Sequence, residues 1–110
     1  MTRLNCLSDN QLRLSLFTID GTPIESNTMW VKVYLRAGGK TFYCINDPEG
    51  VHNKHCHVDG DVLIVDIPGR SLRPGILEYM IEVREVCHFF ADRYKNTFSM
   101  KYKPLEIEMV

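Results

Sequence analysis

The sequence predicts an all-β protein, folded as an antiparallel β-sandwich with little or no helix. Two observations lead to this prediction. Apolar and polar residues alternate with a period of two along most of the chain, which is typical of strands that bury one face. Gly, Pro, Asn and Asp interrupt this alternation at short intervals, as turn residues do. Many short strands between frequent turns favour two packed sheets.

The first expected strands lie in the N-terminal half of the chain. In "QLRLSLFTI" the residues on one face are Leu12, Leu14 and Leu16. The next strand, "MWVKVYLR", has an apolar face made of Met29, Val31, Val33 and Leu35. Its other face carries Trp30, Lys32, Tyr34 and Arg36. The turn "AGGK" then leads into the short strand "TFYCI".

In the C-terminal half, "GILEYMIEVREVCHFF" fits a long strand better than a helix. Strand geometry collects Leu77, Tyr79, Ile81, Val83, Cys87 and Phe89 on one face. Helical spacing gives a less regular stripe, although Glu, Met and Arg favour helices. We expect a strand with a bend near Glu85, a loop at "ADRYKN", and a closing strand with Leu105, Ile107 and Met109 inward. The expected total is seven or eight strands in an Ig-like or jelly-roll-like sandwich.

Length and composition limit the organisation and the partners. The chain has 110 residues, 45% hydrophobic and 25% charged, which suits one core and not two. We expect an N-terminal arm over residues 1–8 and one domain over residues 9–110. The net charge of −1 and the lack of a basic stripe predict no nucleic-acid binding. No apolar run approaches the ~20 residues of a membrane helix, and no secretion signal begins the chain, so we expect synthesis in a cytoplasm and no membrane insertion.

The stretch "VHNKHCHVDGDVLIVDIPG" is rich in metal-ligand residue types and is also a predicted hairpin. Asp59-Gly60 is a preferred centre for a two-residue type I′ turn. That turn would pair Val58 with Asp61, His57 with Val62, Cys56 with Leu63 and His55 with Ile64. Alternation then directs Cys56 into the core and His55 and His57 outward.

A metal site is therefore not expected from this hairpin alone. Two histidines, His55 and His57, are too few, because a structural zinc takes four ligands and a catalytic zinc usually takes three. In this register Asp66 would lie about 10 Å from His57. His52 or His88 would have to complete the site. We predict no cofactor, and His55 and His57 remain weak candidates for a surface metal site.

Enzymatic activity is not expected. The four cysteines, at positions 6, 44, 56 and 87, match neither a CxxC motif nor a tight disulfide framework, so we expect them to be free and buried. Cys87 and His88 are adjacent, and on a strand they would face opposite ways. The nucleophile-elbow, HExxH, phosphate-loop and dinucleotide-binding motifs are absent from the sequence. We predict no catalytic residue.

The outward face of residues 29–36 is the candidate interaction surface, formed by Trp30, Lys32, Tyr34 and Arg36. Aromatic residues together with Arg are typical of interface hot spots. Two interpretations stay open: a partner protein covers this face, or a terminal strand or loop of the same chain does.

A second structural feature is the turn before residue 76. Pro74 fixes φ and Gly75 tolerates a positive φ, so we expect a type II turn that leads into the long strand.

With these elements in order, the chain resembles small β-sandwich proteins encoded by phages and prophages of Bacteroidales, which look like the N-terminal module of phage baseplate upper proteins. The shared segments read "LRLSLFTIDGTPI", "AGGKTFY", "CHVDGDVLIVDI", "GRSLRPGILEYMIEV", "FFADRY" and "LEIEMV". The resemblance covers residues 9–110. It implies a non-enzymatic, often oligomeric module of a phage tail or baseplate, which joins a longer fibre or receptor-binding part. This chain departs from the pattern in having no fibre region after Val110, so we expect a stand-alone virion protein or a fragment of one.

The leading hypothesis is therefore a structural or interaction module that assembles with itself or with other virion proteins. A carbohydrate-binding or adhesion module, in which Trp30 and Tyr34 would stack on sugar rings, is the first alternative. A metal-binding protein that uses His55 and His57 is the second.

Overall fold

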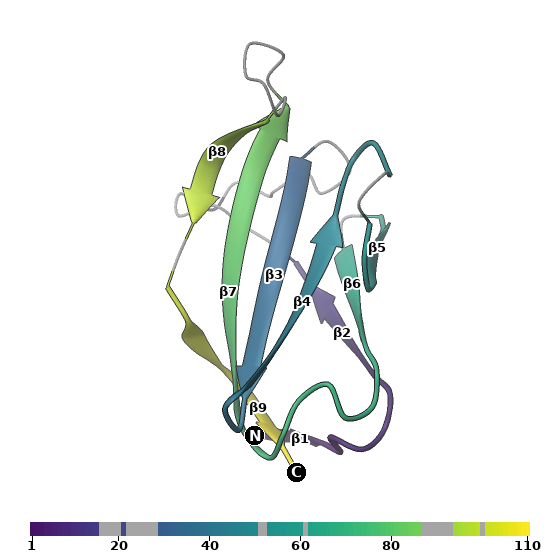
Figure 1. The fold of residues 1–110 in the computed structure, drawn as a ribbon, viewed down its shortest axis with the longest axis vertical. Helices are drawn as coiled ribbons and strands as arrows, with labels where there is room; N and C mark the ends of the chain where they lie inside the picture. Colours follow the sequence, from purple (N-terminus) through teal and green to yellow (C-terminus); the bar gives the residue numbers. More distant parts are fainter. Residues whose placement is uncertain (16–20, 22–28, 51–52, 61, 87–93, 100) are drawn as a thin grey trace.

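The computed structural model of the chain describes residues 1–15, 21, 29–50, 53–60, 62–86, 94–99 and 101–110, with the backbone alone for residues 85–86 and 94–99 (Figure 1). Predictions that concern Leu16, His52, Asp61, Cys87, His88 and Phe89 lie outside these residues.

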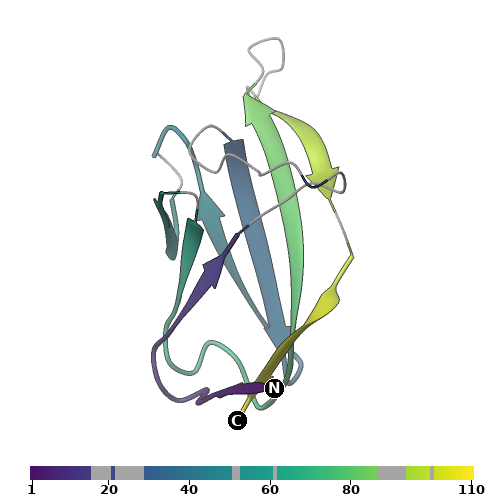
Figure 2. The same ribbon diagram turned by 180° about the vertical axis from the view of Figure 1, so that it is seen from behind.

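The described residues form strands and no helix, which confirms the predicted all-β sandwich. The strands are β1 (Thr2–Leu4), β2 (Asn10–Leu14), β3 (Met29–Ala37), β4 (Lys40–Asn46), β5 (Cys56–Asp59), β6 (Val62–Ile67), β7 (Gly75–Val86), β8 (Tyr94–Ser99) and β9 (Lys103–Met109). Figures 1 and 2 show the two layers from opposite sides.

The strands form a six-stranded and a three-stranded sheet. The larger sheet has the order β1-β9-β7-β3-β4, with β8 also paired to β7, and the smaller sheet has the order β2-β6-β5. The order β2-β6-β5 corresponds to strands B, E and D of an immunoglobulin-type sandwich. The order β9-β7-β3-β4 of the other sheet corresponds to strands G, F, C and C′. The Ig-like alternative of the prediction therefore describes the topology.

The core lies between the two sheets and follows the predicted alternation. β3 contributes Val31, Val33 and Leu35, all with no exposed surface. Further buried contributors include Leu63, Val65 and Ile67 in β6, Leu77, Ile81 and Val83 in β7, and Met109 in β9. β7 is a single strand of 12 residues, which settles the choice between strand and helix. Its register shifts between Val83 and Arg84, close to the expected bend.

The segment that we expected to be a loop, "ADRYKN", is a strand in its second half. Tyr94, Lys95 and Asn96 belong to β8 and pair with the end of β7. β9 pairs with the beginning of β7, over residues 75–79. The loop prediction was wrong for Tyr94, Lys95 and Asn96, because polar composition suggests a loop even where a strand can pair with the long β7; residues 91–93 lie outside the described part of the chain.

The β3–β4 hairpin has the tight turn expected from "AGGK". Gly38 and Gly39 have φ values of +59° and +79°, and Ala37 pairs with Lys40 across them. Positive φ at both central residues is the requirement of a type I′ turn. This turn fixes the register that places Tyr34 directly opposite Tyr43.

The residues of the expected arm, 1–8, lie against the domain. β1 runs parallel to β9, with Thr2 opposite Ile107. Cys6 then ties two further segments together: its N–H donates to the Val110 carbonyl at 2.9 Å, and its carbonyl accepts from the Arg70 N–H at 2.7 Å. Cys6 itself is part of the core.

The turn before β7 differs from the prediction. A type II turn needs φ of about +80° at its third residue, whereas Gly75 has φ +151° and is already the first residue of β7. The expected positive φ at Gly75 is present. A close approach also favours glycine here, because a Cβ atom at position 75 would lie 3.0 Å from the Gly38 nitrogen.

We expect Gly75→Val to lower the free energy of unfolding by more than ~1 kcal/mol, because a β-branched residue is strained at positive φ and would press on the β3–β4 turn. Thermal unfolding measures the effect. Ile76→Val is the matched control, since the neighbouring Ile76 is 41% exposed. Equal melting temperatures for the wild type and Gly75→Val would contradict this account of the turn.

Candidate interaction surface

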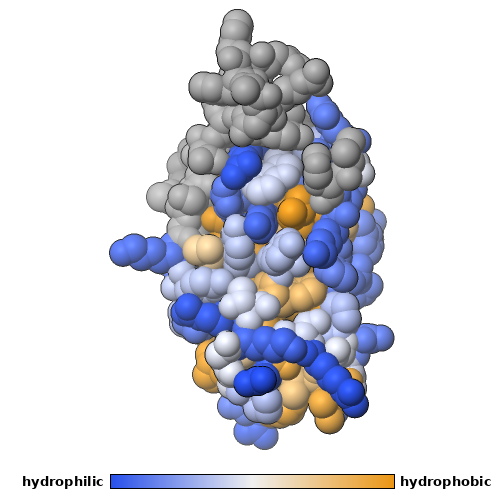
Figure 3. All heavy atoms as spheres, in the orientation of Figure 1, coloured by the Kyte–Doolittle hydropathy of each residue, from blue (hydrophilic) through white to orange (hydrophobic). Residues whose placement is uncertain are grey.

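The outer face of the six-stranded sheet carries the residues that the sequence singled out. We use "outer face" for the side of β4, β3 and β7 that points away from the three-stranded sheet. Its central members are Trp30, Lys32, Tyr34 and Arg36 in β3, Tyr43 in β4, and Glu78, Glu82 and Arg84 in β7. Figure 3 views this side and shows hydrophilic and intermediate residues over most of it, with hydrophobic ones in between.

Trp30 is on this face but is not free for a partner. Its exposed fraction is 8%, and the guanidinium of Arg84 lies 4.4 Å from its ring centroid. Arg84 is held in turn by Glu82, whose Oε1 lies 2.7 Å from Nη2 of Arg84. A cation over an aromatic ring stabilises both groups. The upper end of the outer face is therefore occupied by the chain itself.

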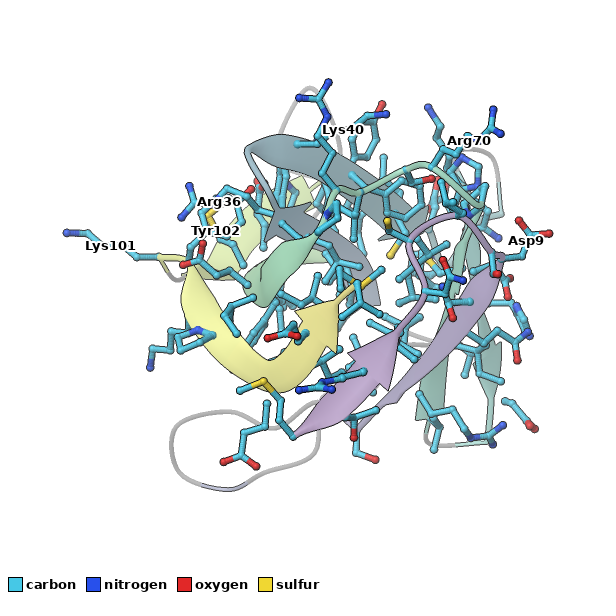
Figure 4. All side chains as sticks on the ribbon, turned by 90° about the horizontal axis from the view of Figure 1, so that it is seen from below. Asp9, Arg36, Lys40, Arg70, Lys101 and Tyr102 are labelled. Atoms are coloured by element: carbon cyan, nitrogen blue, oxygen red, sulfur yellow. The ribbon has the colours of Figure 1, made fainter. Side chains whose placement is uncertain are left out.

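The lower end is also covered by the same chain. The guanidinium of Arg36 lies 3.9 Å from the ring centroid of Tyr102, in the connection that precedes β9. Nε of Arg36 lies 3.2 Å from Oε1 of Glu78. Figure 4 shows Arg36 and Tyr102 together, while Lys101 projects away from the molecule. At this end, the interpretation that the chain covers its own face holds.

The centre of the outer face is open and contains two lysines and two tyrosines. The Lys32 ammonium lies 4.6 Å from the Tyr34 ring centroid and 4.5 Å from that of Tyr43. The Lys54 ammonium lies 4.8 Å from the same Tyr43 ring, and donates to the Tyr43 hydroxyl at 3.3 Å. Tyr43 is 38% exposed. We call this group of four residues the lysine–tyrosine cluster.

The charges on the outer face are not all compensated. Arg36 pairs with Glu78, and Arg84 pairs with Glu82. The Tyr34 hydroxyl also donates to Glu82, at 3.4 Å. Within the part of the chain that the structure describes, neither Lys32 nor Lys54 forms an ion pair, although Glu82 is the cross-strand neighbour of Lys32. The lysine–tyrosine cluster is thus a positively charged area with aromatic walls.

The histidine-rich hairpin forms, but in a register different from the predicted one. Asp59 pairs with Val62, Val58 with Leu63 and His57 with Ile64. The partner strand is shifted by two residues, so the side chains within β5 and β6 keep their predicted faces while their cross-strand neighbours change. As a result His57 and Asp66 are in contact, with Nδ1 3.3 Å from Oδ2. The predicted separation of about 10 Å was wrong because it assumed a turn centred on Asp59-Gly60.

His55 does not share a strand face with His57, contrary to the prediction. Its φ is +59°, and it precedes β5. Lys54 still bonds to Ile45 of β4, with both N–H to carbonyl distances 2.9 Å. One residue later, the His55 carbonyl accepts from the Asp66 N–H of β6 at 2.8 Å. His55 is therefore the point at which the chain passes from one sheet to the other, and its ring lies 5.1 Å from that of Phe42.

The geometry brings no metal-ligand set together around these histidines. Within the described residues, no group of three or more His, Cys, Asp and Glu side chains is arranged to hold an ion. Asp66 also accepts from Nε2 of Gln11 at 2.8 Å. The two carboxylate oxygens of Asp66 thus serve Gln11 and His57.

The cysteines of the described residues, Cys6, Cys44 and Cys56, are free and buried, as the sequence predicted. Cys44 on β4 and Cys56 on β5 meet between the sheets. A hydrogen bond with Cys56 raises the pKa of the Cys44 thiol far above its ordinary value, and burial raises it further. A thiol held in its neutral form is a poor nucleophile.

A hollow of about 560 Å³ lies on the other layer, beside β2 and β6. Its lining residues are Asp9, Asn10, Gln11, Asp66, Ile67 and Pro68. Oδ1 of Asp9 accepts from the Gly69 N–H at 2.7 Å, and Asn10 Nδ2 donates to the carbonyls of Asn5 and Ser8. Asp9 and Asn10 thus bind backbone groups of the neighbouring loop segments.

Sequence reasoning found half of the lysine–tyrosine cluster. Lys32 and Tyr34 were on the predicted face, and Tyr43 and Lys54 were missed. The signal for Tyr43 was present, because a two-residue turn at Gly38-Gly39 fixes Tyr43 opposite Tyr34. No local signal exists for Lys54, which reaches the face only through the isolated pairing with Ile45. Tyr102 likewise depends on the course of the chain between β8 and β9.

No protein-family model, curated protein or solved structure matches this chain. Among the described residues, there is no helix with the length and apolar character needed to cross a bilayer.

We expect His55→Val to destabilise the fold by about 1 kcal/mol or more, because β-branched residues are strained in the left-handed region. His55→Asn should be close to the wild type, because Asn tolerates this conformation. Chemical denaturation of both variants measures the difference. Equal losses in the two variants would show that the imidazole ring, and not the backbone conformation, is what matters at this position.

We expect Cys44 to resist iodoacetamide in the folded protein and to react after unfolding in urea, because the thiolate is the reactive form and the fold disfavours it. Mass spectrometry of tryptic peptides measures the labelling. A cysteine introduced at the exposed Thr2 is the control for reagent activity. Labelling of Cys44 at the rate of that exposed cysteine would contradict the assignment.

Proposed function

We propose that this chain is a non-enzymatic interaction module of a phage tail or baseplate-type assembly, and that it binds a protein partner through the lysine–tyrosine cluster. The observation that carries the proposal is the environment of the Lys32 and Lys54 ammonium groups. Both ammonium groups lie beside the exposed ring of Tyr43, and neither has a carboxylate partner among the described residues. Aromatic side chains with adjacent cations are typical of protein interfaces.

The occupation of the aromatic rings supports a protein partner over a sugar. A sugar stacks on the open face of an aromatic ring. Here Arg84 lies over Trp30, and Lys32 lies over both Tyr34 and Tyr43. A stacked sugar would have to displace these cations and the favourable contacts they make. Carboxylates of a protein partner can instead approach the lysines while leaving the rings where they are.

The remaining polar groups support a role without catalysis. The Cys44 pKa is raised, so its thiol stays protonated at neutral pH. The carboxylates of Asp9 and Asp66 already accept hydrogen bonds from the chain itself. The resemblance in segment order to phage baseplate modules supports the part of the proposal that assigns the chain to a phage tail or baseplate.

The test has two parts. The immobilised chain is used to select binders from a display library of protein fragments, made from the genome that encodes the chain. The same chain is also applied to a glycan array. We expect protein fragments to be recovered. Lys32→Gln/Lys54→Gln should weaken their binding about tenfold or more, since both cations would lose acidic partners.

Lys101→Gln/Lys103→Gln is the matched control, because it removes the same charge from exposed positions at and just before the start of β9. The control should bind as the wild type does. Binding to glycans alone, or equal losses in the two double variants, would overturn the proposal.

A further inference from the structure

β4 is the last strand of the six-stranded sheet, so one of its sides has no neighbouring strand among the residues that the structure describes. Ala37 and Lys40 close the hairpin and are therefore a hydrogen-bonded pair. Hydrogen-bonded pairs alternate along an antiparallel ladder, so the backbone groups of Thr41, Tyr43 and Ile45 point away from β3. The bonds of Ile45 to Lys54, on the side away from β3, agree with this assignment.

Among the described residues, the chain covers this edge only at its ends. At one end, Lys54 pairs with Ile45, and His55 then turns the chain into the other sheet. At the other end, the connection from β6 to β7 runs past the start of β4 (Figure 1), where Nζ of Lys40 donates to the Arg70 carbonyl at 2.7 Å. Between them, the N–H and C=O groups of Thr41 and Tyr43 have no hydrogen-bond partner in the described part of the chain.

The open edge of β4 and the lysine–tyrosine cluster are adjacent and share Tyr43. Thr41 and Tyr43 are exposed, and the ammonium groups of Lys32 and Lys54 lie 4.5 Å and 4.8 Å from the Tyr43 ring centroid. An unpaired strand edge accepts an extended peptide as an additional strand. The side chains of that strand would alternate, so every second one would face the two lysines.

The charges indicate which extended segment fits. A second copy of this chain, paired through β4 to β4, would bring Lys40 and the two lysines of the cluster close to the same residues of its partner. Like charges at such an interface are unfavourable. A segment with Asp or Glu at alternate positions would compensate Lys32 and Lys54.

We propose that the β4 edge at Thr41 and Tyr43 binds an extended, acidic segment of the partner protein as an added β-strand. The inference rests on the proposed function, since it names the partner chemistry of the same surface. Backbone hydrogen bonds to Thr41 and Tyr43 supply the pairing. Carboxylates at alternate positions, next to Lys32 and Lys54, supply the selectivity.

The experiment uses a short, blocked peptide of alternating Thr and Glu as the probe, and NMR of the isotopically labelled full chain as the readout. We expect the amide signals of Thr41 and Tyr43 to shift and their hydrogen exchange to slow on binding. A peptide of alternating Thr and Lys should leave both unchanged. Lys32→Gln/Lys54→Gln should weaken the Thr-Glu peptide about tenfold or more, and Lys101→Gln/Lys103→Gln should not.

A backbone variant separates strand pairing from charge attraction. Thr41→Pro removes an N–H group that faces the open edge and makes no bond to β3, and proline is tolerated on edge strands. We expect the NMR spectrum of this variant to be that of a folded protein. We also expect the variant not to bind the Thr-Glu peptide. Thr41→Val, which keeps the N–H group, is the control and should bind. If Thr41→Pro does not fold, the same peptide methylated at alternate backbone nitrogens replaces it, and should not bind.

Several outcomes would overturn the inference. These are the absence of binding by the Thr-Glu peptide, equal binding of the Thr-Lys peptide, full binding after Thr41→Pro, and slowed exchange at Thr41 and Tyr43 caused by dimerisation of the chain alone. If display-selected fragments still depend on Lys32 and Lys54 in any of these cases, the proposed function stands and only the added strand is wrong. If no fragment binds either, both fail.

Discussion

The pairing of β3 with β4 on one side and β7 on the other is the constraint on which the rest of the structure depends. Strand alternation gives β3 two faces of different chemistry. Val31, Val33 and Leu35 on one face have no exposed surface and anchor the core. On the other face, Lys32, Tyr34 and Arg36 each lie opposite one residue of β4 and one residue of β7. A slip of one residue would exchange the two faces, so the core and the interaction surface are fixed by the same register.

Features that depend on local pattern were predictable from the sequence. The alternation in β3, β7 and β9, the Gly38-Gly39 turn and the burial of Cys44 and Cys56 follow from residue types at fixed spacing. The strand assignment of residues 75–86 followed from the cleaner period-two pattern, although helix propensity pointed the other way.

Features that depend on long-range pairing were not predictable. The β5–β6 register differs from the predicted one by two residues. A turn centred on Asp59-Gly60 and a turn centred one residue later put the same side chains on the same face, so the hydrophobic pattern cannot distinguish them. The contact between His57 and Asp66 follows only from the observed register. The position of Lys54 beside Tyr43 likewise requires the single bridge between Ile45 and Lys54. No spacing in the sequence encodes either contact.

The histidine-rich stretch has a different role from the one its composition indicates. His55 adopts a positive φ where the chain leaves the six-stranded sheet, and the step from Lys54 to His55 moves the backbone bonds from β4 to β6. This change of sheet leaves the middle of β4 uncovered. It also holds Lys54 at the edge, where its side chain reaches Tyr43. His55, one of the residues that looked like metal ligands, thus helps to shape the surface that we assign to a partner.

The central claim is that this surface, and not the opposite layer, binds the partner. The most direct measurement is hydrogen–deuterium exchange of the chain, by mass spectrometry, alone and in complex with a protein fragment selected by display. The account predicts that protection on binding is concentrated in β4, over residues 40–46, with smaller changes in β3. Protection confined to β2, β5 and β6, with exchange of β4 unchanged, would contradict it.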